Sequence, residues 1–216
     1  MSEAASIRLS YESIAKKKIV GLPTEVGYDK LSLRTPLFYR AANDWTFAAG
    51  LRSQLTDFEI SDHTLLDEDR LYSFDLAVFL GKKHTESLDW LLLFNPALAG
   101  DFENFKGDAF NYLTIAAAKW KTSETFEWIL GAVYTTGIGD DLFLPEIGFI
   151  WEPSENTSFV LAGPIIRYRY KFSDSFDFVL GGQFSGNRWN TQSTYAGVQE
   201  ERNFRLRSYR LSATLE

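Results

Sequence analysis

Cysteine is absent from the 216-residue chain, which excludes disulfide bonds, thiolate nucleophiles and cysteine metal sites. Long apolar runs are also missing, because charged residues or glycine interrupt the apolar stretches well before the roughly 20 residues that a membrane-spanning helix requires. Basic residues are in the minority, and the net charge of −7 argues against nucleic acid as a partner. We therefore expect neither a helical membrane protein nor a nucleic-acid-binding protein.

Aromatic residues are abundant, at 16% of the chain, and they favour strands over helices. Apolar and polar residues alternate repeatedly, whereas helical spacing is nowhere convincing, so we predict about twelve strands in a single domain covering residues 1–216. The approximate ranges are 5–14, 28–40, 44–57, 71–82, 87–99, 109–121, 124–136, 146–152, 157–163, 165–172, 175–185 and 202–215.

The connections between these strands alternate in length. Five are short and polar, as hairpin turns are: 41–44, 82–87, 121–124, 152–156 and 173–175. Five are longer: 15–27, 58–70, 100–108, 137–145 and 186–201. Gly163-Pro164 makes one connection short where a long loop is expected. An up-and-down meander then has short turns at one end and most long loops at the other, which is the layout of an outer-membrane barrel.

Five of the six tryptophans fall at the short-turn end of the predicted meander. They are Trp45, Trp90, Trp120, Trp128 and Trp151. Indole favours the boundary between membrane and water, because its ring is apolar and its N–H requires a polar partner. The pattern predicts an interfacial girdle; the alternative is that these residues plug the end of a soluble core.

The two faces of the strands differ in chemistry. In the second strand Leu31, Leu33, Leu37 and Tyr39 share one parity, and Lys30, Ser32, Arg34 and Arg40 share the other. Charged residues that oppose the large apolar side chains also occur in other strands, and we predict that they line the interior: Arg34, Arg52, Asp75, Asp89, Glu127, Arg167, Arg169, Lys171 and Asp177.

Two questions decide which face of the strands points inward: whether side chains can fill the barrel interior, and what covers its exterior. A twelve-stranded barrel encloses more space than side chains fill, so an apolar interior would leave a large void. An apolar exterior needs lipid, detergent or a second sheet to cover it, because no helix remains to do so. We therefore predict an all-β fold, an antiparallel up-and-down transmembrane β-barrel of about 12 strands. A soluble lipocalin-like barrel that binds an apolar ligand is an alternative.

Two segments resemble a family of uncharacterised bacterial outer-membrane β-barrel proteins. Residues 144–189 show Leu-Pro before a glycine and an aromatic pair, Trp-x-Pro at a tight turn, and an alternating basic and aromatic strand before a glycine-rich one. Residues 89–112, DWLLLFNPALAGDFENFKGDAFNY, are similar to the same family's strand, Asp-Phe loop and following strand. The resemblance implies a barrel fold and location in the bacterial outer membrane, without an activity.

The two ends of the chain depart from the usual pattern of such proteins. The start, MSEAASIRLSYES, lacks the basic and then apolar profile of a secretory signal, so an exported form would have lost its signal. The end, RLSATLE, lacks the terminal aromatic residue that outer-membrane barrels usually carry. We expect either that a final segment is missing or that Leu215-Glu216 is an expression remnant.

Catalytic and metal-binding patterns are weak. A membrane-embedded lipid hydrolase could use His63 with Ser61, but their spacing fits no known arrangement, so an outer-membrane lipid hydrolase remains only an alternative. The acidic loop at 57–70 lacks the frame of a preorganised calcium site. We expect no enzymatic activity, no cofactor and no metal.

The expected function is passive: a channel or transporter for small solutes, or a structural or accessory envelope protein. Arg167, Arg169 and Lys171 alternate along one strand and would form either a permeation surface or a structural ion network. The expected partners are membrane lipid, an unidentified small solute and, as further candidates, other outer-membrane proteins.

Overall fold

The computed structural model describes residues 6–18, 24–61, 66–102, 109–137, 141–173, 176–195 and 198–215. Among them, no helix is long and apolar enough to cross a membrane. The described strands are β1 (Arg8–Lys18), β2 (Glu25–Ala42), β3 (Trp45–Ile60), β4 (Arg70–Lys83), β5 (Leu88–Gly100), β6 (Phe110–Lys121), β7 (Phe126–Thr135), β8 (Leu142–Ser154), β9 (Thr157–Ala162), β10 (Ile165–Ser173), β11 (Phe176–Tyr195) and β12 (Val198–Leu215). The predicted all-β class is confirmed.

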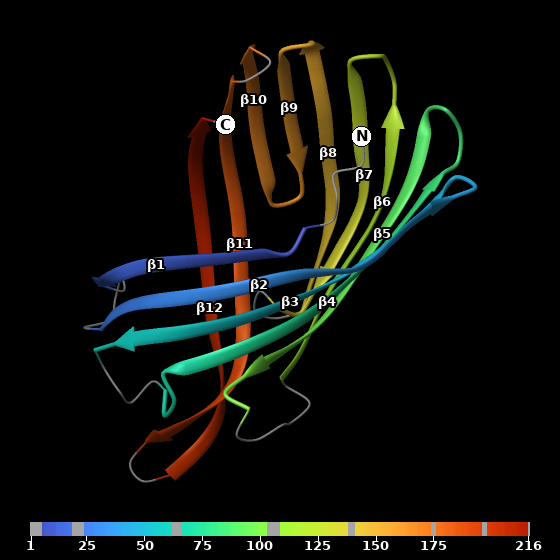
Figure 1. Cartoon of the computed structure of the whole chain (residues 1–216). Helices are drawn as coiled ribbons and strands as arrows, with labels where there is room; N and C mark the ends of the chain where they lie inside the picture. Colours follow the sequence, from blue (N-terminus) through green and yellow to red (C-terminus); the bar gives the residue numbers. More distant parts are fainter. Residues whose placement is uncertain are drawn as a thin grey trace.

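Each strand pairs with the next one along the chain, antiparallel, in a single sheet. The short hairpin turns gather at one end of the sheet, which we call the turn end, and the opposite end is the loop end (Figure 1). The turn between β2 and β3 places Asn43 and Asp44 at φ 50° and 66°. These residue types tolerate the left-handed region that tight two-residue hairpins require. The predicted meander is therefore confirmed.

The sheet closes into a barrel where β11 reaches β5, in a parallel contact between Asn190 and Gly100. Glycine is required there, because a Cβ on Gly100 would lie 2.6 Å from the Asn190 carbonyl oxygen. β1 and β12 stand at the two ends of the hydrogen-bonded order, and additional strands lie outside the closed ring. The ring thus contains fewer strands than the twelve predicted for the barrel.

The predicted loop at 186–201 is wrong for most of its length, because β11 and β12 continue through it as paired strands. The segment is rich in polar residues, so it lacks the apolar alternation that marks the other strands. Its threonines and aromatic residues nevertheless favour extended backbone. In Figure 1, β1 to β4 run across β11 and β12. The β11–β12 hairpin also extends beyond β10, whose pairing with β11 ends at Gln183.

Strand register assigns the two faces of the sheet. Arg34, Arg52 and Asp75 lie in one row across β2, β3 and β4, on what we call the inner face. Leu31 and Leu33, on the outer face, keep 43% and 40% of their surface exposed. The predicted opposition between charged and large apolar side chains is therefore present in the structure.

One detail of the predicted parity is wrong. A bulge in β2 between Pro36 and Phe38 shifts the register, so that Tyr39 pairs with Ala48 and Arg40 with Phe47. This moves Tyr39 to the inner side and Arg40 to the outer side. Proline donates no hydrogen bond to the ladder, which is why it is found at bulges.

A compact apolar core lies at the loop end, between the inner faces of β2 to β5 and the hairpin of β11 and β12. We call it the loop-end core, and its buried members are Tyr28, Phe58, Ile60, Leu66, Leu71, Ala99 and Trp189. The Phe58 ring meets Trp189 edge-on at 5.5 Å and Phe204 at 5.0 Å between centroids. The interior is therefore apolar at this end and polar further toward the turn end.

The short connection at Gly163-Pro164 is held from inside the barrel. Gly163 has a φ of 53°, a conformation that suits glycine, and its backbone N–H donates to the Glu146 carboxylate. Glu146 is buried on β8, so its charge is stabilised by this hydrogen bond. Because of this turn, β9 and β10 are much shorter than β11, and the sheet does not reach the loop end at these two strands (Figure 1).

Candidate functional site

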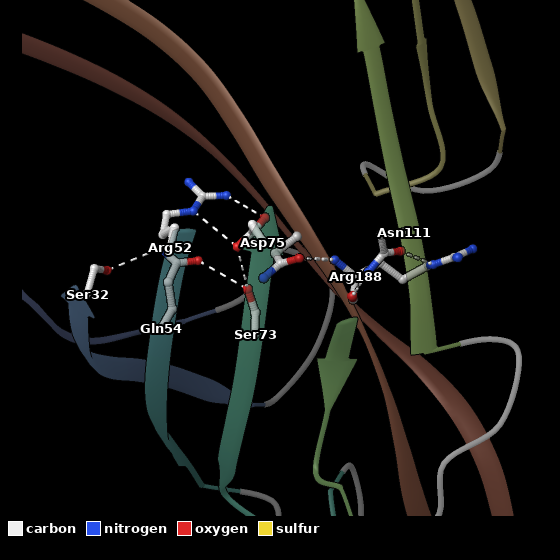
Figure 2. Close-up of polar contacts among 8 residues, drawn as sticks. Ser32, Arg52, Gln54, Ser73, Asp75, Asn111 and Arg188 are labelled. Atoms are coloured by element: carbon white, nitrogen blue, oxygen red, sulfur yellow. Dashed lines mark hydrogen bonds and ion pairs between the residues drawn. The ribbon is translucent and has the colours of Figure 1, made fainter. Parts of the chain in front are cut away.

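The inner face of β2, β3 and β4 carries a connected polar network (Figure 2). Arg52 donates two hydrogen bonds to Asp75, from Nε at 3.1 Å and from Nη2 at 2.7 Å. Ser73 donates to the same carboxylate at 3.0 Å, and the Gln54 amide donates to Ser32 at 3.1 Å. Sequence reasoning predicted Arg52 and Asp75 as interior residues, and the structure joins them directly.

The ion pair between Arg52 and Asp75 links the neighbouring strands β3 and β4. The Asp75 side chain keeps only 8% of its surface exposed, whereas that of Arg52 keeps 35%. A carboxylate this buried depends on its partners, since removing one partner of a buried pair typically costs about 3 to 5 kcal/mol. The network therefore stabilises the wall and leaves the outer part of the Arg52 guanidinium in contact with water.

Two of the predicted interior residues, Asp89 and Glu127, lie on the inner face at the turn end. Lys119 lies 3.1 Å from Glu127 and 3.7 Å from Asp89, both from Nζ to a carboxylate oxygen. All three side chains are partly exposed, so water screens these pairs. Asp89 and Lys119 also line a pocket of about 680 Å³ near the turns. The structure thus brings the predicted Asp89 and Glu127 together through a lysine.

The predicted basic ladder on β10 is paired with a carboxylate on the neighbouring strand β11. Arg169 donates to Asp177 on β11, and Lys171 faces Asp177 in the register. Arg167 is exposed and lies opposite Gly181 on β11 and Val160 on β9. The four predicted residues therefore lie together on the inner face, with a single carboxylate among them.

The loop end is tied to the β11–β12 hairpin by residues that the sequence did not single out. The Asp67 carboxylate accepts hydrogen bonds from the Thr194 backbone N–H at 2.7 Å and from its hydroxyl at 2.8 Å. Asp101 accepts from the Gln192 backbone N–H at 3.1 Å. These contacts link positions about a hundred residues apart, so no local sequence signal could have revealed them.

The other side of the hairpin is bound to β6. Asn111 donates from its amide to the Arg188 carbonyl at 2.8 Å and accepts from Arg188 Nε at 2.9 Å. Figure 2 shows β11 passing between the strands that carry Ser73 and Asn111. The hairpin therefore crosses the interior at the loop end and narrows it.

The five tryptophans of the predicted girdle lie at the turn end on the outer face. Neighbours in the register confirm a common level: Trp120 lies opposite Trp128, and Phe126 opposite Trp151. Trp90 keeps 51% of its surface exposed, and the Lys82 ammonium lies 5.0 Å from the Trp45 ring centroid. Their role at a membrane interface stays a prediction.

The loop end is acidic outside the core. A pocket of about 420 Å³ is lined by Asp57, Asp67, Glu68, Asp69, Arg70, Tyr72 and Asp101. A hydrogen bond to Asp57 raises the pKa of the Arg70 guanidinium, so that it stays charged. Within the described part of the chain, no three His, Cys, Asp or Glu side chains are grouped so as to hold a metal ion.

The proposed catalytic pair is only half described. His63 lies outside the described residues. The Ser61 hydroxyl accepts a hydrogen bond from the Glu25 backbone N–H at 2.8 Å, and the Ser61 N–H donates to the Glu25 carbonyl at 3.0 Å. Ser61 therefore extends the pairing of β2 and β3.

Comparison of the chain with family models, with curated proteins and with solved structures finds no match. The resemblance to uncharacterised outer-membrane barrels accordingly stays a prediction.

Proposed function

We propose that this protein is a passive β-barrel of the bacterial outer membrane that acts as a channel for small polar solutes. One observation carries the proposal: a sheet with a charged, hydrogen-bonded inner face presents a continuous outer face of large apolar side chains. Outer-face residues such as Leu31, Phe74, Leu92 and Leu130 keep about 40% of their surface exposed. Such a surface far exceeds the few hundred Å² of apolar patch that soluble monomers usually expose.

The height of the apolar band supports a membrane environment. On β5 the outward positions run from Trp90 to Leu98, and this stretch of the strand has the length of about 9 to 11 residues with which a tilted strand crosses a bilayer. Transmembrane barrels carry an apolar band about 25 Å tall, bordered by aromatic residues. Beyond this band the outer face turns polar at Asp57 and Arg70, whose side chains pair at 2.9 Å. The length of the band along the strand and its aromatic border therefore fit a strand that crosses a bilayer at a tilt.

The same geometry disfavours the soluble alternative. A lipocalin-like barrel needs an apolar interior to bind its ligand. Here the mid-height inner face carries Arg52, Asp75 and Gln54, and the apolar part of the interior is already filled by Trp189 and Phe58. The polar interior instead supports passage or binding of a water-soluble molecule.

Fluorescence quenching tests the location. The protein is folded into phosphatidylcholine vesicles whose acyl chains carry bromine near the headgroup, and two single-tryptophan variants are compared, one keeping Trp90 and one keeping Trp189. We expect strong quenching of Trp90 and weak quenching of Trp189, because only Trp90 lies on the outer face. Equal quenching, or a protein that stays monomeric in buffer without detergent and does not enter vesicles, would contradict the membrane assignment.

Conductance in planar bilayers tests the channel. We expect small single-channel steps, because the β11–β12 hairpin narrows the loop end. Insertion without any conductance would replace the channel by a structural or accessory role in the envelope.

A further inference from the structure

Three arginines lie in register on adjacent strands of the inner face. Arg8 on β1 is opposite Arg34 on β2, and Arg34 is opposite Arg52 on β3. Residues directly opposite in an antiparallel sheet have Cβ atoms about 4.5 to 5.5 Å apart. The three guanidinium groups therefore project from neighbouring positions, and we call them the arginine row.

The arginine row has too few counter-charges in the described structure. Asp75 is bound to Arg52 through both carboxylate oxygens. Neither Arg8 nor Arg34 forms an ion pair with any described carboxylate. Glu12, four residues further along β1, is already paired with Lys30 and Arg210. Since like charges directly opposite each other destabilise a sheet, the row favours an external anion.

Hydrogen-bond donors lie in the adjacent row. Ser10, Ser32 and Gln54 are opposite one another on β1, β2 and β3, one pair of residues along from the arginines. A guanidinium binds an oxyanion through two parallel N–H donors, and hydroxyl or amide groups beside it can donate to the remaining oxygen atoms. The two rows together thus offer charge and directional donors to a tetrahedral anion.

The height of the row determines how a ligand reaches it. Thr35 follows Arg34 in the chain, and Leu51 precedes Arg52. These two neighbours lie opposite each other on the outer face, within the apolar band. A lipid headgroup stays at the edges of that band. An anion at the arginine row would therefore come from water on the inner side of β1 to β3.

We propose that the arginine row binds a small water-borne oxyanion of the phosphate class. This site deepens the proposed function by naming the chemistry of a solute, yet binding itself requires no open pore. The bound anion would bridge Arg8 and Arg34, with Arg52 contributing the part of its guanidinium that Asp75 leaves free.

The test uses the full chain folded in non-ionic detergent micelles, with inorganic phosphate titrated by calorimetry at low ionic strength. We expect binding that weakens as sodium chloride is added. Arg34→Gln and Arg8→Gln should each weaken it about tenfold, because each removes one charge-assisted contact. Arg70→Gln is the matched control: it removes an arginine of the loop end and should leave phosphate affinity unchanged.

A third variant predicts a change in the opposite direction. Asp75→Asn removes the internal counter-charge of Arg52 and should tighten phosphate binding, a gain that a purely structural arginine row would not give. If this variant fails to fold, Arg8→Gln still decides, because Arg8 is exposed on the edge strand β1. Absence of phosphate binding by the unmodified protein, or an affinity in Arg34→Gln and Arg8→Gln equal to that of the unmodified protein, would overturn the proposal.

Two further experiments are needed. One distinguishes free phosphate from a lipid headgroup as the source of the anion, and the other distinguishes the anion site from the proposed channel function. Micelles containing phosphatidylglycerol replace free phosphate in one arm, and binding only there would overturn the water-borne origin. Phosphate binding in micelles by a protein that never enters vesicles would contradict the proposed function and leave the site intact. Conductance without phosphate binding would support the proposed function and contradict the anion site.

Discussion

At the turn end, Trp90 and Trp120 stand on the outer face with about half of their surface exposed, whereas at the loop end Trp189 keeps 3%. The outer tryptophans contact ring neighbours along the same face, as Trp151 does with Phe159 at 5.3 Å. Trp189 packs against Phe58, on a strand more than a hundred residues away in sequence. The turn end is thus organised by local hairpins, and the loop end by long-range contacts.

This difference predicts where stability resides. The turn end offers its aromatic side chains to the surroundings, so its energy depends on lipid or detergent. The loop end buries its own apolar core and ties the β11–β12 hairpin to β5 and β6. Substitutions at the loop end should therefore lower the free energy of unfolding more than matched substitutions at the turn end.

The largest effect is expected for Trp189→Ala. Removing this side chain leaves a cavity beside Phe58 and Phe204 and should lower the free energy of unfolding by about 3 to 5 kcal/mol. Urea titration in detergent micelles, followed by circular dichroism, measures the loss. Trp120→Ala is the control and should cost about 1 kcal/mol or less, because that side chain is half exposed. Similar losses for both would remove the distinction between the ends.

The second effect concerns barrel closure at Gly100. In Gly100→Ala the added Cβ would meet the Asn190 carbonyl oxygen at 2.6 Å, so β5 and β11 must separate, at about 1 to 3 kcal/mol. Gly50→Ala adds the same methyl group, whose closest neighbour lies at 3.4 Å, and should change stability by no more than about 0.5 kcal/mol. The same titration compares the two, and limited proteolysis of β12 reports hairpin release. Equal behaviour of both variants would argue against the closure.

The third effect is at the loop that holds the hairpin. Asp67→Asn weakens both hydrogen bonds to Thr194 and should cost about 1 to 2 kcal/mol. Hydrogen exchange of the amides in β11 should rise with it. Glu68→Gln changes an exposed neighbour in the same way and should leave exchange unaltered. Unchanged protection of the Thr194 amide in Asp67→Asn would show that this contact does not hold the hairpin.

The smallest effect is expected at the turn end. Lys119→Gln removes two ion pairs, to Glu127 and Asp89, but all three side chains are open to water. The loss should stay below about 1 kcal/mol and shrink further as salt is added. A loss above 2 kcal/mol would mean that this cluster is as important as the loop-end core. Arg52→Gln is the contrasting variant, because it leaves the buried Asp75 carboxylate without its cation.

Several features were readable from sequence because they depend on residues close together in the chain. Alternation of period two assigned Arg52 and Asp75 to one face and Leu31 and Leu33 to the other. The polar turns fixed the level of Trp120 and Trp128. The prediction failed at Tyr39, because a bulge shifts parity without changing composition. It also failed at 186–201, where β11 and β12 continue as paired strands. Trp189, Asn190, Thr191 and Ser193 on β11 are buried, whereas residues 198–203 at the start of β12 are exposed, so neither segment shows the alternating pattern.

The sequence by itself determined which side chains share a face and which connections are tight, because both follow from the two-residue period of a strand and from the backbone preferences of turn residues. Only the tertiary structure decided that β11 crosses to β5, that Trp189 is buried while the other tryptophans are not, and that Arg8, Arg34 and Arg52 meet in one row. These features depend on strand register and on contacts between distant segments, and neither is encoded in any local pattern.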